Sequence, residues 1–197
     1  MRDARVAVLV GTKGRGSNMA ALVKAGQAGE MPAVVVLVVA PRSSTPALET
    51  AAELGVPTVV LDWKADGYSA ALMAALLDAQ IDIVCLAGYM TLLPDAVLEG
   101  FPGRVLNIHP ALLPKFGGKG MYGHHVHEAV IAAGEAESGC SVHLVTPVYD
   151  EGEVVVQLHC PVEADDTPET LAARVLTLEH QAYPMAVAEV WSRARGS

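Results

Sequence analysis

Cysteine is scarce in this chain: it occurs three times, at Cys85, Cys140 and Cys160, far apart along the sequence. The number is odd and no two cysteines have the C-x-x-C spacing of a zinc site, so we expect buried free thiols in a reducing compartment. The longest apolar run, residues 33–40, is far shorter than the roughly 20 residues that a membrane helix needs. The first residues also lack the layout of a signal peptide. These absences predict a soluble, cytoplasmic protein.

A surplus of basic residues is missing as well. The chain has 13 Lys and Arg against 22 Asp and Glu, which gives a formal net charge of −9. A surface this acidic repels a phosphate backbone and argues against a nucleic-acid partner, although one or two local cations can still bind a small anionic substrate. Hydrophobic residues make up 52% of the 197 residues, enough for a buried core. That length predicts a single domain over residues 1–197.

Segments typical of strands and helices alternate along the chain. The expected strands are residues 6–10, 33–40, 58–61, 81–87, 105–109, 141–145 and 154–161, and the expected helices are residues 19–28, 45–54, 69–79, 126–133 and 167–191. Thr45 and Pro46 predict the N-cap and the first position of the second helix. Alternation at this spacing, with strands that are apolar throughout, predicts an α/β fold: a doubly wound, mostly parallel, Rossmann-like sheet with helices on both faces.

A glycine-rich loop, residues 11–18, separates the first strand from the first helix. Backbone amides and the positive end of the helix dipole make such a turn a phosphate site, and Ser17 and Asn18 add side-chain donors. The dinucleotide fingerprint is not met, because no third small residue follows Gly16 at the required spacing and the second strand ends without an acidic residue. A small phosphate is therefore the favoured interpretation. A tight turn without a ligand, and a dehydrogenase in which Arg42 holds a 2′-phosphate, are the alternatives.

Asn107 and His109 are two residues apart in an expected strand, so their side chains point to the same face while Ile108 points to the core. Pro110 ends the strand and holds His109 in an extended conformation. Open α/β sheets bind ligands at the carboxyl ends of their strands, and an amide beside an imidazole can stabilise an oxyanion and move protons. The alternative is a core Asn and His whose polar groups are satisfied by the backbone.

Two further polar features accompany this pair. Asp150 lies in a loop, and beside His109 its carboxylate would favour the protonated imidazole, whereas an exposed loop aspartate is the alternative. His124, His125 and His127 lie at the end of a Gly- and His-rich stretch, residues 117–127. No acidic or cysteine partner stands at ligand spacing, so we expect a polar loop near the active site rather than a metal site.

Several segments, in order along nearly the whole chain, resemble phosphoribosylglycinamide formyltransferases, a branch of the folate-dependent formyltransferase family. They are residues 16–18, 86–90, 107–116, 139–143, 149–152, 166–171 and 179–184. The Asn-x-His-Pro-x-Leu-Leu-Pro stretch beginning at Asn107 is shared by all folate-dependent formyltransferases, so it indicates the chemistry alone. The phosphate loop, the length and the Glu-His-x-x-Tyr-Pro ending indicate the glycinamide ribonucleotide branch.

The resemblance implies a role for each matching residue. The catalytic residues would be Asn107, His109 and Asp150. The substrate phosphate and ribose would contact Gly16, Ser17, Asn18 and Glu179. Because Leu176 offers no charge, we also expect Arg15, ahead of Lys13 and Lys64, to bind the phosphate, with a solvated loop cation as the alternative. The folate would contact Met90, Thr91, Leu92, Leu93, Lys64 and Asn107. The chain departs from the family at Thr91 and Leu176, where basic or polar residues are common, and in its longer glycine loop and 117–127 segment.

The reaction that the resemblance implies is formyl transfer from 10-formyltetrahydrofolate to the amine of glycinamide ribonucleotide, a step of purine biosynthesis. The amine attacks the formyl carbon directly, protonated His109 and Asn107 stabilise the tetrahedral intermediate, and Asp150 keeps His109 charged. A hydrolase of formyl-folate is the first alternative, followed by a methionyl-tRNA formyltransferase and a non-catalytic phosphate-binding module. No metal is implied, and a homodimer is one alternative for the oligomeric state.

Overall fold

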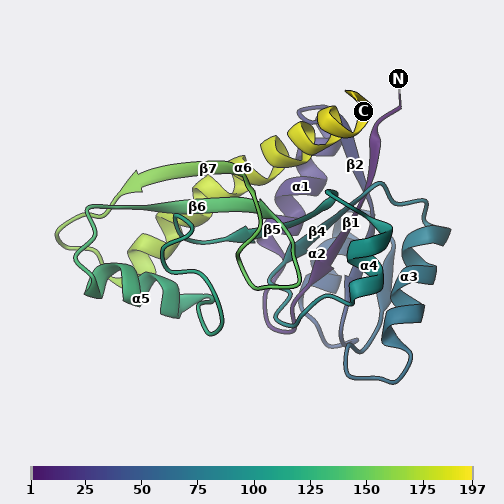
Figure 1. Cartoon of the computed structure of the whole chain (residues 1–197), viewed down its shortest axis with the longest axis horizontal. Helices are drawn as coiled ribbons and strands as arrows, with labels where there is room; N and C mark the ends of the chain where they lie inside the picture. The colour runs from purple at the N-terminus through teal and green to yellow at the C-terminus, as the bar shows by residue number, and fades with distance from the viewer. Residues whose placement is uncertain (1, 197) are drawn as a thin grey trace.

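The computed structural model describes residues 2–196, which form one seven-stranded sheet flanked by helices (Figure 1). The strands are β1 (Ala4–Val10), β2 (Ala33–Ala40), β3 (Thr58–Val60), β4 (Ile83–Ala87), β5 (Val105–His109), β6 (Glu137–Leu144) and β7 (Val154–Pro161). The helices are α1 (Ser17–Gln27), α2 (Ala47–Glu53), α3 (Tyr68–Asp78), α4 (Asp95–Gly100), α5 (His124–Ala132) and α6 (Pro168–Gly196).

The strand order β3-β2-β1-β4-β5-β6-β7 confirms the predicted doubly wound, mostly parallel sheet. Strands β1 to β5 are parallel to one another, whereas β6 runs antiparallel to β5 and β7 antiparallel to β6. The chain winds from β1 outward to β3 and then returns to β4 on the other side of β1. The winding direction therefore changes between β1 and β4, and open α/β sheets bind ligands at the carboxyl ends of strands beside such a point.

Strand β1 is buried on both faces, which explains its unbroken apolar sequence. Val6, Val8 and Val10 belong to a core cluster with residues of α1 and α6. Ala7 and Leu9 belong to a second cluster, with residues of α3 and α4, on the opposite face. Alternate residues of a strand point to opposite faces, and burying each Val or Leu stabilises the fold by roughly 1.5–3 kcal/mol. The helices on both faces of the sheet are therefore confirmed.

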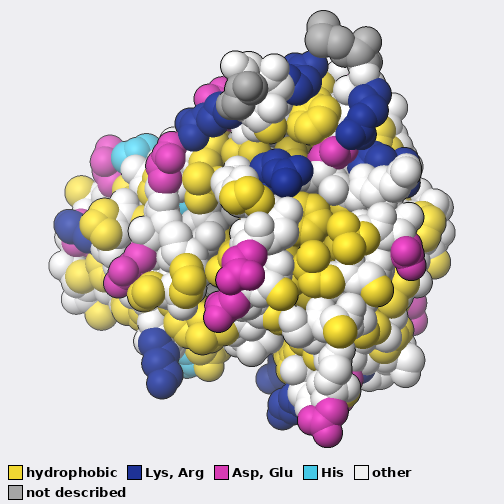
Figure 2. Space-filling model, turned by 45° about the vertical axis from the view of Figure 1, so that its right-hand side comes forward, with side chains coloured by type: hydrophobic (Ala, Val, Ile, Leu, Met, Phe, Trp, Pro, Cys, Tyr) yellow, Lys and Arg dark blue, Asp and Glu magenta, His cyan; other side chains and the backbone are white. Residues whose placement is uncertain are grey.

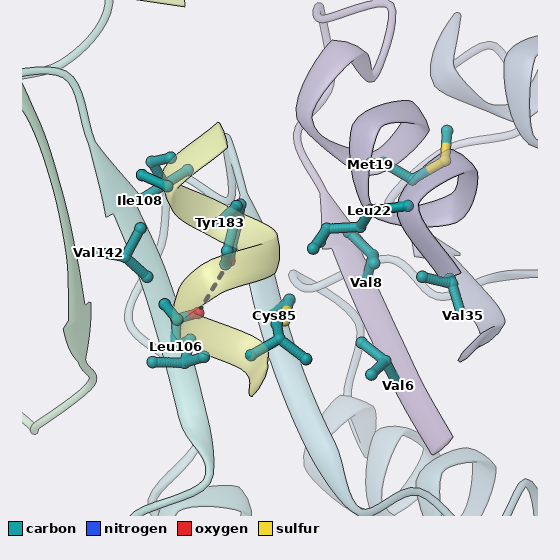
Figure 3. Packing of buried hydrophobic residues seen from close by; sticks show 14 of the residues in the cluster. Val6, Val8, Met19, Leu22, Val35, Cys85, Leu106, Ile108, Val142 and Tyr183 are labelled. Atoms are coloured by element: carbon teal, nitrogen blue, oxygen red, sulfur yellow. Dashed lines mark hydrogen bonds between the residues drawn. The ribbon is translucent and has the colours of Figure 1, made fainter. Parts of the chain in front are cut away.

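Helix α6 is joined to the centre of the sheet by Tyr183. The Tyr183 hydroxyl, which is fully buried, lies 2.8 Å from the carbonyl oxygen of Leu86 and 3.2 Å from that of Leu106. Figure 3 shows this side chain pointing from α6 toward Leu106 on β5, beside Cys85 and Val142. The side chain bridges the neighbouring strands β4 and β5, so it fixes the position of α6 on the sheet.

The elements differ from the expected ones in several places, of which three are informative. Helix α4 was not predicted, because its six residues are too few to show a helical period. Helix α2 begins at Ala47, and Thr45 does not cap it: the N–H of Leu48 bonds to the carbonyl oxygen of Thr45, whose hydroxyl is buried without a partner among residues 2–196. Strand β6 begins at Glu137, four residues earlier than expected, because it pairs with β7 along that whole length.

The cysteines are free and buried, which confirms that part of the sequence prediction.

In the part of the chain that the structure describes, no helix has the length and apolarity needed to cross a membrane. Figure 2 shows one face of the molecule, on which Lys and Arg side chains gather near the two chain ends while acidic side chains are scattered among hydrophobic ones.

Candidate active site

Two glycines shape the point where β1 and β4 end. A Cβ atom on Gly11 would lie 2.0 Å from the carbonyl oxygen of Gly88, so only glycine allows the two strand ends to approach. Gly16 precedes α1 with a φ of 77°, a conformation that favours glycine. Among residues 2–196, no side chain caps α1 and its first turn holds no acidic residue. The first amides of α1 can therefore bind an anion.

A cavity of about 730 Å³, called the main cavity below, opens at the carboxyl ends of β4 and β5. It is lined by Asn18, residues 88–90, residues 107–110, residues 118–124, His127, Tyr149, Asp150, Ala172, Ala173, Leu176 and Glu179. These segments come from α1, from the turns after β4 and β5, from α5, from the loop after β6 and from α6. The winding of the sheet thus brings residues far apart in the sequence to one site.

The side-chain amide of Asn107 is held by His143 on the neighbouring strand β6. The two residues are partners in the β5–β6 register, and Nδ2 of Asn107 lies 3.1 Å from Nε2 of His143. Nδ1 of His143 lies 3.0 Å from the carbonyl oxygen of Leu144, and Nε2 faces both the Asn107 amide and the Asp150 carboxylate. The contact with His143 orients the amide and leaves its second N–H for a ligand in the main cavity.

His109 and Asp150 form the second half of the site. Nε2 of His109 donates to the carbonyl oxygen of Phe116 at 2.7 Å, and Nδ1 lies 3.6 Å from Oδ2 of Asp150. The other carboxylate oxygen, Oδ1, lies 3.4 Å from Nε2 of His143. The N–H of Gly118 donates to Oδ2 of Asp150 at 2.9 Å. Asp150 therefore contacts both histidines and fixes the loop after β6 against the 117–123 segment.

The charges of this pair follow from burial. Burial lowers the pKa of His109, and although Asp150 and the Phe116 carbonyl oppose this effect, the pKa lies below the usual 6.5. Burial raises the pKa of Asp150, but His143, His109 and the Gly118 N–H together outweigh it, and the pKa lies below the usual 3.8. The resting site at pH 7 holds ionised Asp150 beside neutral His109. The expectation that Asp150 keeps His109 charged is wrong here, because desolvation of the imidazolium exceeds the attraction of the carboxylate.

Asn18 and Glu179 form a pair at another part of the main cavity. Nδ2 of Asn18 donates to Oε2 of Glu179 at 2.6 Å, which joins the start of α1 to α6. Burial raises the pKa of Glu179 above 4.5, against the effect of this hydrogen bond. Oδ1 of Asn18 is buried and has no hydrogen-bond partner in the described part of the chain. The Glu179 carboxylate and Oδ1 of Asn18 are both acceptors, so hydroxyl groups of a ligand suit this part of the cavity.

Comparison with known proteins decides the family. Residues 4–187 match a family model described as formyl transferase. The chain belongs to the formyl transferase family. The chloroplastic phosphoribosylglycinamide formyltransferase of Arabidopsis thaliana is 41% identical to it over 187 residues, which cover 92% of this chain and 63% of the plant protein. This formyl transferase chain thus spans less than two thirds of the length of that relative.

Solved structures agree with this assignment to the formyl transferases. The phosphoribosylglycinamide formyltransferase of Brucella melitensis is 42% identical, with 95% of both chains covered and a TM-score of 0.85. Glycinamide ribonucleotide transformylase 1 from Symbiobacterium toebii is 36% identical, with 98% of this chain and 89% of the other covered and a TM-score of 0.87. The resemblance that the motifs predicted is confirmed. A formyltetrahydrofolate deformylase from Pseudomonas syringae, 21% identical with a TM-score of 0.81, shares the fold alone.

The predicted site residues of this formyl transferase fall into two groups. Those that line the main cavity are Asn18, Met90, Asn107, His109, Asp150 and Glu179. Arg15 instead lines a separate hollow with residues 43–46, and its carbonyl oxygen accepts from the Thr50 hydroxyl at 3.0 Å. Leu93 is buried in the core cluster beside α3 and α4. The other predicted residues outside the cavity lining are Gly16, Ser17, Lys64, Thr91 and Leu92.

One wall of the main cavity is apolar and aromatic. Met90 and Tyr149 line it and remain exposed in the absence of a ligand. Tyr89 is supported from behind, because its ring meets the edge of Trp63 at a centroid distance of 5.4 Å and its hydroxyl lies 2.9 Å from that of Tyr68. A flat, largely apolar group such as a pterin or an aminobenzoyl ring fits a wall of this kind.

Sequence reasoning missed the role of His143, which was named only within a matching segment. A signal was present: His143 lies in a strand, two residues after Ser141, and could have been placed on one face like Asn107 and His109. Its partner could not be identified, because the antiparallel register of β6 on β5 depends on tertiary structure. Among residues 2–196, no group of three or more His, Cys, Asp or Glu side chains could hold a metal ion.

Proposed function

We propose that this protein transfers a formyl group from 10-formyltetrahydrofolate to the amine of glycinamide ribonucleotide. The observation that carries the proposal is the convergence of Asn107, His109 and Asp150 in one cavity, with Oδ2 of Asp150 3.6 Å from Nδ1 of His109. The names of the relatives support the substrates. The convergence of these three residues, which the motifs imply as a catalytic trio, is a geometry that can carry out acyl transfer.

The two substrates would occupy different walls of the main cavity. The ribonucleotide phosphate would lie beside Asn18, where α1 meets the main cavity, and would bind the amides of Gly16, Ser17 and Asn18. Its ribose hydroxyls would donate to Glu179 and to Oδ1 of Asn18. The folate rings would lie along the wall of Met90, Tyr89 and Tyr149. Contacts from Arg15 to the phosphate, and from Lys64, Thr91, Leu92 and Leu93 to the folate, stay predictions.

The chemistry follows from the protonation states. The amine attacks the formyl carbon, and the second N–H of Asn107 binds the oxyanion that forms. Neutral His109 takes the amine proton at Nδ1, where Asp150 stabilises the new imidazolium. His109 then delivers the proton to N10 of the folate as the bond between N10 and the formyl carbon breaks. The oxyanion returns to a carbonyl, and His109 is neutral again at the end of the cycle.

Hydrolysis of formyl-folate is the alternative that uses the same three residues, with water as the acceptor. The Asn18–Glu179 pair favours a hydroxyl-bearing acceptor, because a hydrolase has no need of a ribose site. The relatives that this chain matches at 36–42% identity carry transferase names.

The test is an absorbance assay of folate deformylation with purified protein, 10-formyltetrahydrofolate and either glycinamide ribonucleotide or water alone. We expect turnover that requires the ribonucleotide, and a loss on the order of 100- to 1000-fold or more in His109→Ala. Lys115→Met, on an exposed side chain paired with Glu135 outside the main cavity, serves as the unaffected control. Equal deformylation with and without the ribonucleotide would instead establish the hydrolase.

Two properties of the whole protein complete the proposal. We place the protein in the cytoplasm, as the sequence predicts, although the plant relative is named chloroplastic. A homodimer remains a proposal that light scattering of the purified protein can test.

A further inference from the structure

The Gly- and His-rich segment is the one unusual stretch of sequence that the catalytic scheme does not use. Residues 118–124 and His127 line the main cavity directly. Among all the described residues that line this cavity, Lys119 is the one Lys or Arg, whereas Asp150 and Glu179 contribute carboxyl groups. Both proposed substrates are anions, so a cavity with this lining needs local positive charge to bind them.

His127 is an unsatisfied group in the wall of the cavity. Its side chain belongs to α5, the residue is 4% exposed, and it lines the main cavity. Nδ1 of His127 is buried with no hydrogen-bond partner among residues 2–196. An unpaired buried polar atom costs free energy, and most buried polar atoms in native structures have a partner. Because His127 lines the main cavity, a ligand there is the partner that we infer for it.

The first turn of α5 adds a third feature. Helix α5 begins after Gly123, has no side-chain cap and no acidic residue in its first turn within the described chain, and its first residue, His124, lines the cavity. Its unpaired N–H groups and the positive end of its dipole therefore favour an anion. Lys119 stands in the loop that leads into this turn and forms no ion pair with residues 2–196.

We propose that Lys119, His127 and the first amides of α5 form an anion-binding subsite of the main cavity, which contacts an oxyanion group of a substrate: the phosphate of the ribonucleotide, in addition to the α1 amides, or a carboxylate of the folate tail. The proposal rests on the proposed function for the identity of these two sources. It explains how the site binds anions although Leu176, on the adjacent wall of α6, supplies neither charge nor hydrogen bond.

Lys119 supplies the positive charge of this subsite, and His127 supplies a ring nitrogen. His109 and His124 face His127, and burial together with these two neighbours lowers the pKa of His127. The carboxylates of Glu128 and Glu169 lie 3.4 Å and 3.5 Å from Nε2 of His124, and all three side chains are largely exposed. These carboxylates thus lie beside His124 at the surface, whereas an anion inside the cavity meets Lys119 and His127.

The binding test uses inorganic phosphate as the probe and the side-chain NMR signals of the histidines as the readout. We expect a saturable shift of the His127 signal and a rise in its pKa when phosphate binds, because a nearby anion stabilises the imidazolium. In Lys119→Met, the phosphate concentration at half saturation should rise about three- to tenfold, whereas Lys119→Arg should bind nearly as wild type. Lys115→Met, an exposed lysine of the same loop outside the cavity, is the matched control. A His127 signal that phosphate does not move, or equal binding in Lys119→Met, overturns the subsite.

The kinetic test distinguishes the two sources. A rise in KM for the ribonucleotide alone in Lys119→Met assigns the subsite to the phosphate, and a rise for the formyl-folate alone assigns it to the folate tail. If Lys119→Met leaves both KM values unchanged, or if KM rises in Arg15→Ala alone, the subsite is overturned. In that case, turnover by the wild type still supports the proposed function. A different result is that the wild type is inactive while phosphate still shifts its His127 signal, and less so in Lys119→Met. That result refutes the proposed function and supports the subsite.

Discussion

Asp150 is held in a backbone conformation that few residues other than glycine adopt, with a φ of 57°. Such a conformation costs about 1–2 kcal/mol, and strained residues of this kind concentrate at functional sites. Here the strain places one carboxylate oxygen near His109 and the other near His143, while the Gly118 N–H holds the carboxylate in place. The backbone of this residue therefore helps to set the spacing of the groups that we propose to be catalytic.

Asp150→Asn tests the electrostatic part of this arrangement, because Asn also tolerates a positive φ and keeps the shape. Asp150 raises the pKa of His109, which burial has already brought below 6.5. Removing the charge should lower that pKa further and destabilise the imidazolium formed during turnover. We expect kcat at pH 7.5 to fall on the order of 100- to 10,000-fold, and the NMR titration midpoint of His109 to move to lower pH.

A His109 midpoint that is equal in Asp150→Asn and in the wild type would show that the two residues do not interact. A fall in kcat without a shift of the midpoint would mean that Asp150 acts through the position of the loop. Circular dichroism and the KM for the ribonucleotide report whether the fold and the other wall of the cavity remain intact in the variant.

For single residues, the local sequence pattern predicted the pair Asn107 and His109 on one strand. It did not predict the residues that contact this pair. Asn107 and His109 share a face because strand side chains alternate, which the sequence shows directly. The contact of Asp150 with His109 joins residues 41 positions apart in the numbering, and the contact of Asn107 with His143 depends on a β5–β6 register. The charge of His109 was predicted wrongly for a related reason: burial is a property of the folded molecule.

Among the elements, the strands and the long helices were predictable and the short ones were not. Continuous apolar runs mark β1, β2 and β4, because both faces of these strands are covered. Helix α4 and the exact start of α2 depend on contacts with the sheet rather than on periodicity. Helix α6 continues through Pro184 to Gly196, since the tertiary packing of its buried side outweighs the one backbone hydrogen bond that proline lacks.

Tyr183→Phe tests how α6 is held on the sheet. The substitution keeps the ring in the core and removes the hydroxyl that donates to the carbonyl oxygens of Leu86 and Leu106. We expect the free energy of unfolding, measured with urea, to fall by about 1–2 kcal/mol. Tyr122→Phe, on a half-exposed ring, is the control and should stay within about 0.5 kcal/mol of wild type. Equal stabilities of the two variants would show that the buried hydroxyl contributes nothing to the position of α6.

For the molecule as a whole, the acidic surface and the anionic substrates set opposite requirements. A net charge of −9 favours solubility and repels anions at long range. The proposed site would bind anions through local groups: the N-termini of α1 and α5, Lys119, and amide donors such as Asn107. The binding of substrates should therefore depend on short-range contacts, which salt screens less than a field spread over the surface.

The stability of the whole protein should fall as the pH drops below about 6.5, the pKa of histidine in an unfolded chain. Burial lowers the pKa of His109, His127 and His180 in the folded state. Below pH 6.5 the unfolded chain therefore binds more protons than the folded one, and the free energy of unfolding decreases by at most about 1.4 kcal/mol per pH unit for each histidine. Glu179 opposes this trend near pH 5, because its raised pKa makes the folded state bind a proton there.

Urea unfolding at intervals from pH 7.5 to pH 5 measures this loss. We expect a decline that begins near pH 6.5, and a shallower decline in His180→Gln, which removes one half-buried imidazole from outside the main cavity. A second loss should begin near pH 4, as Asp82 and Asp150, whose pKa values lie below 3.8 in the folded state, take up protons on unfolding. If stability were constant from pH 7.5 to pH 5, the three histidines would carry the same protons in both states, and the neutral His109 required by the proposed proton transfer would lose its support.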